Sequence, residues 1–151
     1  IYERRHTRDI NAFGGLWKVM PVYAVLTLIV ALSSMGLPGL NGFVGEFTIL
    51  LGAFGSEAIG SYWFAGLSAL GVILAAVYML FMFQKMFLGP LDKAENKELK
   101  DINWREILTL VPLLILIFWI GLYPKPFFDL MGPSVEHLVE AINAAAVVSL
   151  P

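Results

Sequence analysis

One ionisable side chain interrupts the first long apolar run of this sequence. Glu46 is the only acidic or basic residue between Lys18 and Glu57, and it stands in the block Gly42-Phe43-Val44-Gly45-Glu46-Phe47. A charged side chain at the centre of a membrane-spanning helix is unfavourable by about 2.5–3.5 kcal/mol or more. Ionisable residues at such depth mark ion and proton pathways. The type and place of Glu46 therefore predict a proton-transfer group.

A glycine- and proline-rich segment shortly before Glu46 predicts a helix break. Pro38 lacks a backbone donor and clashes with the preceding turn, and its neighbours Gly36 and Gly39 lower helix propensity further. The segment is either a gating hinge or a fixed break that makes room for water. Asn41 follows it, and this residue either binds freed carbonyls or a water chain or, more simply, caps the second half-helix.

The composition is that of a membrane protein. The chain of 151 residues is 58% hydrophobic with a mean hydropathy of +0.76, and its charged share of 15% compares with about 25% in soluble domains. The net charge of −2 implies no nucleic-acid surface. The absence of cysteine excludes disulfides, cysteine-ligated zinc and iron–sulfur clusters within the chain. His6 and His137 are isolated, so no metal site is expected.

These patterns predict an all-α, polytopic membrane protein with three transmembrane segments and a C-terminal amphipathic helix. The uncharged run around Glu46 is too long for one straight helix and too short for two full spans, so we expect one crossing made of two half-helices, 21–35 and 41–54. Two plain spans follow. The predicted segments are a cytoplasmic loop at 1–20, the broken span at 21–54, spans at 62–87 and 107–124, and an amphipathic tail helix at 133–148.

Loop charges predict the orientation. The segment before the first span and the loop between the second and third spans are rich in lysine and arginine, whereas the loop between the first two spans has none. By the positive-inside rule, the N-terminal segment is cytoplasmic and the C-terminus is external or periplasmic. Lys85 lies at the cytoplasmic end of the second span. It either belongs to a proton route or extends its ammonium group to the lipid headgroups.

Several motifs in order resemble one known family. They are Tyr2-Glu3-Arg4-Arg5-His6-Thr7-Arg8-Asp9, Gly14-Gly15-Leu16, Gly36-Leu37-Pro38-Gly39, Phe43-Val44-Gly45-Glu46-Phe47 and Gly121-Leu122-Tyr123-Pro124. This set, which extends over nearly the whole chain, resembles the subunit M family of bacterial NADH:quinone oxidoreductase, respiratory complex I. The resemblance implies an antiporter-like fold of fourteen helices, of which this chain is the C-terminal part with a broken twelfth helix.

The resemblance also implies a function and its surroundings. Such subunits are parts of a proton-translocating enzyme of the bacterial inner membrane, and they conduct protons without redox chemistry of their own. NADH, FMN, iron–sulfur clusters and quinone are expected in partner subunits, and other membrane subunits, including antiporter-like neighbours, are expected beside this one. The family's acid on its twelfth helix corresponds to Glu46. Its central lysines and a further glutamate belong to earlier helices that are not in this sequence.

Two other functions compete with this interpretation. A multisubunit sodium/proton antiporter shares the antiporter-like fold and a similar broken-helix region. A structural, lipid-facing subunit without proton traffic is the third possibility, but it leaves an acid beside a broken helix unexplained. The opening block 2–9 and Gly121-Leu122-Tyr123-Pro124 favour the complex I family.

Overall fold

The structure is a computed structural model that describes residues 1–56 and 62–148. Within these ranges the chain forms helices joined by turns and no β-strand, which confirms the predicted all-helical class. The longer helices are α3 (Pro21–Ser34), α4 (Asn41–Gly55), α5 (Tyr62–Phe83), α7 (Trp104–Leu122) and α8 (Lys125–Val148). The short elements are α1 (Tyr2–Arg5), the 3-10 turn η1 (Ile10–Ala12), α2 (Leu16–Val19), the π-helix η2 (Gln84–Leu88) and α6 (Ala94–Lys97).

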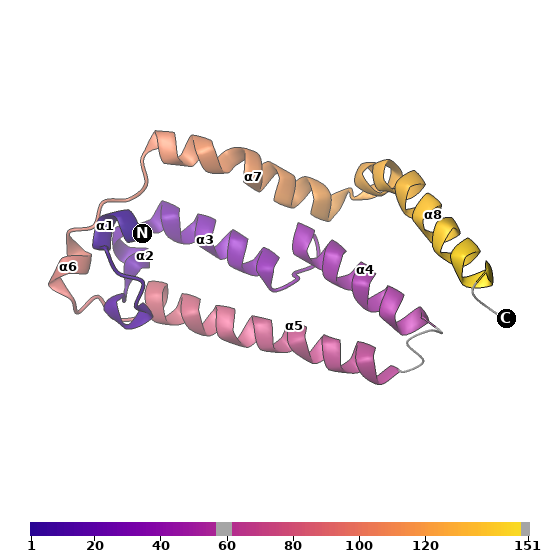
Figure 1. Cartoon of the computed structure of the whole chain (residues 1–151). Coiled ribbons are helices and arrows are strands. Elements are labelled where there is room, and N and C mark those ends of the chain that lie inside the picture. The colour runs from indigo at the N-terminus through magenta and orange to yellow at the C-terminus, as the bar shows by residue number, and fades with distance from the viewer. Residues whose placement is uncertain (57–61, 149–151) are drawn as a thin grey trace.

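The two halves of the interrupted helix lie in the middle of the molecule. In Figure 1, α3 and α4 follow one another, with α5 along one side and α7 along the other. Helix α4 contacts both α5 and α7, and α3 contacts α5. The short helices gather at the end of the molecule where α3 begins, and α8 leads away from the opposite end of α7 (Figure 1). Helix α4, which carries Glu46, thus lies between two long helices.

Two of these helices are long and apolar enough to cross a membrane. They are Tyr62–Leu88, which joins α5 to η2, and Trp104–Leu122, with mean hydropathies of 2.2 and 2.0. Only 6% and 0% of their most apolar windows are buried inside the molecule. A core helix of a soluble protein would be mostly buried, so these apolar surfaces suit contact with lipid or other membrane helices. Helix α3 is apolar but shorter.

The buried core lies at the end of the molecule where the short helices gather. Phe13, Leu16, Ala24, Phe83 and Phe87 form one buried cluster, in which the rings of Phe83 and Phe87 stack with centroids 4.7 Å apart. This cluster joins the N-terminal segment to the start of α3 and the end of α5. Near the helix break, in the middle of the molecule, the described residues Ala31 and Leu40 are buried but do not belong to this cluster.

Some helix bounds differ from the predicted ranges for identifiable reasons. Helix α7 begins at Trp104, three residues before the predicted span, because Asn103 and Glu106 form a reciprocal capping box. Helix α8 begins at Lys125 and continues through Pro133, whereas the predicted tail helix begins at that proline. Pro126 lies in the first turn of α8, where a missing backbone N–H is tolerated. The π-helical turn at the end of α5 has no counterpart in the prediction.

Candidate functional site: the broken helix and Glu46

Helix α3 ends in a backbone motif that requires a glycine. Gly36 has a φ of 70°, its N–H donates to the carbonyl of Ser33 at 3.1 Å, and the N–H of Leu37 donates to the carbonyl of Leu32 at 3.1 Å. These two bonds and the left-handed residue form a Schellman motif, in which glycine is strongly preferred. The carbonyls of Leu32 and Ser33 near the end of α3 are therefore satisfied by the chain itself.

A tight turn follows at residues 37–40. Pro38 occupies its second position and Gly39, with a φ of 94°, its third, and the N–H of Leu40 donates to the carbonyl of Leu37 at 3.1 Å. Proline followed by a residue of positive φ is the pattern of a type II turn. We call residues 35–40 the break. The predicted interruption at Gly36, Pro38 and Gly39 thus consists of two backbone motifs in succession.

Asn41 does not cap the second half-helix through its side chain, contrary to our expectation. The N-cap residue of α4 is Leu40, and no side chain accepts a hydrogen bond there. The Asn41 side-chain oxygen instead accepts a hydrogen bond from the Ser33 hydroxyl. This bond links the end of α3 to the start of α4. A Cβ on Gly42 would lie 1.8 Å from the Ser33 carbonyl oxygen, so the two half-helices approach closely across the break.

The Glu46 carboxylate lies against the break. Long side chains on a helix point back toward its N-terminus, and an ideal Cβ on Gly36 would lie 2.2 Å from Glu46 Oε2 and 3.1 Å from its Cδ. Only a residue without a side chain leaves room for the carboxylate at this place. Glu46 is half-buried, and no described residue forms a hydrogen bond or ion pair with it. The carboxylate therefore contacts the break without a polar partner from the described residues.

Lys85 is not brought to Glu46. It lies in η2, which contacts η1 and α2, and its ammonium donates to the side-chain oxygen of Asn11. The ammonium also lies 5.6 Å from the centroid of the Phe81 ring. These contacts belong to the end of α5 remote from α4, so within the described residues Lys85 and Glu46 do not form a pair.

A polar cluster at the start of α3 and α7 was missed by the sequence reasoning. The Asp101 carboxylate accepts from the backbone N–H of Val22 at 2.8 Å and of Tyr23 at 3.1 Å. Arg4 donates to both carboxylate oxygens of Glu106, at 3.0 and 2.8 Å. The spacing Asn103-x-x-Glu106 is a recognisable capping-box signal. The contact of Asp101 has no signal in the sequence, because its partners lie 79 and 78 residues away.

Gly121 is a second residue whose role only the structure reveals. A Cβ on it would lie 2.3 Å from the Gly39 carbonyl oxygen and 2.5 Å from the Leu40 Cα. The end of α7 therefore rests directly on the backbone of the break. The sequence shows Gly121 as part of a motif, but it gives no indication of which backbone the residue meets.

Comparisons with known proteins agree with the motifs and the fold. Residues 1–75 match the family model described as "NADH:quinone oxidoreductase/Mrp antiporter, TM". The chain is 42% identical over 144 residues to NADH-quinone oxidoreductase subunit M of Rhodobacter capsulatus, covering 95% of this chain and 27% of that protein. It is 38% identical over 140 residues to NADH-ubiquinone oxidoreductase chain 4 of Arabidopsis thaliana, covering 93% of this chain and 28% of that one.

A solved structure shows the same likeness in three dimensions. A chain of respiratory complex I from Thermus thermophilus with bound NADH matches with a TM-score of 0.75 and 37% identity, covering 84% of this chain and 26% of that chain. The chain thus spans about a quarter of the length of the relatives that it matches. Because sequence and structure agree over most of its residues, the chain belongs to the NADH:quinone oxidoreductase/Mrp antiporter membrane family.

Proposed function

We propose that this chain forms a proton-transfer segment of a membrane subunit of NADH:quinone oxidoreductase, with Glu46 as the group that takes up and releases the proton. One observation carries the proposal. The Glu46 carboxylate lies against the left-handed Gly36 of a broken apolar helix, and no described residue pairs with it. An acid at this depth without a structural partner is best explained by function.

The proposed proton transfer at Glu46 needs a second charged group in the complete subunit. From the resemblance, we expect this group to be a lysine on an earlier helix, while this chain supplies the acid. An approaching cation favours the charged form of a carboxylic acid, so movement of the cation or of local water is the proposed switch. The left-handed Gly36 of the helix break leaves the room that the carboxylate occupies.

We propose the following topology for the chain. Residues 21–54 form one broken crossing, 62–87 and 107–124 form two further crossings, and 133–148 lie at the membrane surface. The basic segment 1–20 lies on the cytoplasmic side of a bacterial inner membrane and the C-terminus on the external side. The exposed aromatic residues Trp104 and Tyr123, 71% and 56% exposed at the two ends of α7, suit the two membrane interfaces.

Electron transfer is assigned to partner subunits. The chain has no cysteine, and its described residues gather no group of three His, Asp or Glu side chains. From the resemblance, we expect NADH, FMN, the iron–sulfur clusters and quinone in partner subunits. Other membrane subunits of complex I, including antiporter-like neighbours, are the proposed partners. The hydrogen bond from Lys85 to Asn11 supports an anchoring role for this lysine at the cytoplasmic side rather than a proton relay.

Replacing Glu46 by Gln in the complete subunit tests the proposed function. The amide keeps the shape of the side chain but carries no exchangeable acid proton. We expect proton pumping per NADH oxidised to fall at least about tenfold, while the amount of assembled enzyme stays unchanged. In inverted membrane vesicles, a pH-sensitive dye measures proton pumping and NADH absorbance measures NADH oxidation. NADH:ferricyanide reduction reports the amount of assembled enzyme.

The matched control is Glu3→Gln, which makes the same chemical change on an exposed residue of α1. A wild-type pumping ratio in Glu46→Gln would refute the proposed function and leave a structural subunit as the better interpretation. The sodium/proton antiporter alternative makes a different prediction. It requires proton movement that depends on sodium and proceeds without NADH in the same vesicles.

A further inference from the structure

The first turn of α3 is capped by a residue from a distant segment. Pro21 opens this helix and has no N–H, and the N-cap residue Met20 makes no side-chain cap. Val22 and Tyr23 carry the first two N–H groups, and both donate to the Asp101 carboxylate, at 2.8 and 3.1 Å. A carboxylate at a helix N-terminus also opposes the positive end of the helix dipole. Asp101 thus performs the capping that local sequence does not provide.

The position of Asp101 is set by the beginning of α7. Its carboxylate accepts from the N–H of Ile102 at 2.7 Å, and its carbonyl lies 3.4 Å from Nη2 of Arg4. The same Arg4 nitrogen holds the Glu106 carboxylate, and Glu106 is fixed in the capping box of α7. Hydrogen bonds between an ionised donor and an ionised acceptor are roughly twice as strong as neutral ones. The start of α3 is therefore tied to the start of α7.

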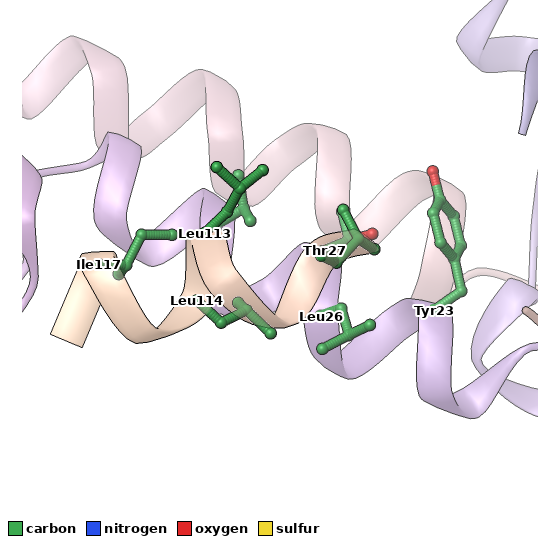
Figure 2. A pocket seen from close by; sticks show the side chains of 8 residues that line it. Tyr23, Leu26, Thr27, Leu113, Leu114 and Ile117 are labelled. Atoms are coloured by element: carbon green, nitrogen blue, oxygen red, sulfur yellow. The ribbon is translucent and has the colours of Figure 1, made fainter. Parts of the chain in front are cut away.

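The other end of α7 is tied to the break. Gly121 rests on the backbone of Gly39 and Leu40. Between these two attachments, α3 and α7 separate around a groove of about 300 Å³. Figure 2 shows its apolar lining, with Leu26 and Thr27 from α3 facing Leu113 and Leu114 from α7. The two helices are thus joined near both ends, through Asp101 at one end and Gly121 at the other. Both contacts influence the position of α3 along its axis.

We propose that Asp101 is a positioning residue for Glu46, acting through α3 and the break, an inference that rests on the proposed proton-transfer function. The cap fixes where α3 begins, and α3 ends in the Schellman glycine against which the Glu46 carboxylate lies. A change at the cap displaces Gly36 relative to Glu46, because the helix between them is a rigid element. Asp101 touches neither the proton nor Glu46 directly.

Asp101→Asn in the complete subunit of the assembled enzyme tests this inference. The amide has the same shape, but its NH₂ group cannot accept a hydrogen bond from a backbone N–H, and the negative charge is lost. We expect proton pumping per NADH to fall about twofold to tenfold, comparable with the loss of a helix cap, with the amount of assembled enzyme unchanged. Asp101→Glu, which restores the charge, should recover part of the ratio. Asp92→Asn, in the same loop and exposed, is the matched control and should behave as wild type.

Hydrogen exchange gives a second readout that does not depend on pumping. In Asp101→Asn, amides of residues 21–34 should exchange faster than in wild type, and those of residues 62–83 should not change. A purely structural defect would lower enzyme content, NADH oxidation and proton pumping together. The number of protons pumped per NADH oxidised would then stay at the wild-type value. A wild-type ratio in Asp101→Asn, alongside a low ratio in Glu46→Gln, would overturn the inference alone.

Failure of the proposed function is recognised separately. If Glu46→Gln retains the wild-type pumping ratio, the assignment of proton transfer to Glu46 fails. Hydrogen exchange then tests whether Asp101 holds the start of α3 in place. This part of the inference is overturned if the amides in the first turn of α3 exchange at the same rate in Asp101→Asn and in wild type.

Discussion

The contact between Gly36 and Glu46 can be tested by adding one methyl group. Gly36→Ala places a Cβ where it would lie 2.2 Å from Glu46 Oε2, far inside normal contact distance. The nearest neighbour is the far end of a flexible side chain, so the carboxylate, rather than the backbone, should give way. The variant therefore moves the acid without changing its chemistry.

The structure provides the magnitude and a matched control. Restoring a contact distance of about 3.2 Å requires the carboxylate to move by about 1 Å, and a displacement of this size can slow a geometry-dependent step by up to about 100-fold. Alanine at a positive φ is itself unfavourable by about 1–3 kcal/mol. Gly39→Ala carries the same kind of strain at a φ of 94°, but its nearest neighbour is Leu122 Cδ2 at 3.7 Å. The difference between the two variants therefore isolates the contact with Glu46.

The assay is proton pumping per NADH in inverted vesicles, normalised to assembled enzyme. We expect Gly39→Ala to lower thermal stability but to keep the pumping ratio within about twofold of wild type, and Gly36→Ala to lower that ratio at least about fivefold. Equal ratios in the two variants would show that the position of the carboxylate against Gly36 does not matter. The structural argument for Glu46 would then be wrong.

Three further substitutions test the packing at the break and the role of Lys85. Gly121→Ala should lower the stability of the protein by about 1–3 kcal/mol through overpacking, because its Cβ would meet backbone atoms of Gly39 and Leu40. Gly66→Ala in α5 is the control, since no atom lies within 4 Å of its Cβ. It should be neutral or raise the stability by up to about 1 kcal/mol. Heat-inactivation midpoints of the purified enzyme compare the two, and an equal effect of both would contradict the packing described. Lys85→Met should keep pumping per NADH within about twofold of wild type, because its ammonium binds Asn11 at the end of α5 remote from α4 and an exposed hydrogen bond contributes little to stability. A loss as large as that in Glu46→Gln would place Lys85 on the proton route.

Local chemistry made the break predictable from sequence. Pro38 and its flanking glycines have few uses inside an apolar helix, and the length of the run left no room for a second full span. The same run made Glu46 conspicuous, since no other Asp, Glu, Lys, Arg or His falls within it. Each of these inferences depends on residues that are close in sequence, and each feature lies where the sequence indicated.

Features that depend on distant partners were not predictable. Asp101 stands in a loop of mixed charge that reads as solvated, yet its carboxylate caps a helix that begins 80 residues earlier in the chain. Gly121 needs no side chain because of a backbone brought against it by folding. Asn41 has the residue type of an N-cap, but the Ser33 hydroxyl binds its side-chain oxygen instead. In each case a tertiary contact decides the role of the residue.

The self-contained hydrogen bonding of the break has a consequence for hydration. The end of α3 and the turn after it close three backbone hydrogen bonds within the loop itself, so water can enter or leave the space beside Glu46 without unravelling that end of the helix. The first turn of α4 is different, because no side chain caps it and its N–H groups have no acceptor among the described residues. Water arriving at the break would therefore be oriented by these donors, with its oxygen toward α4 and its hydrogens free to face the carboxylate. The two sides of the interruption therefore differ in how much of their hydrogen bonding is left to solvent.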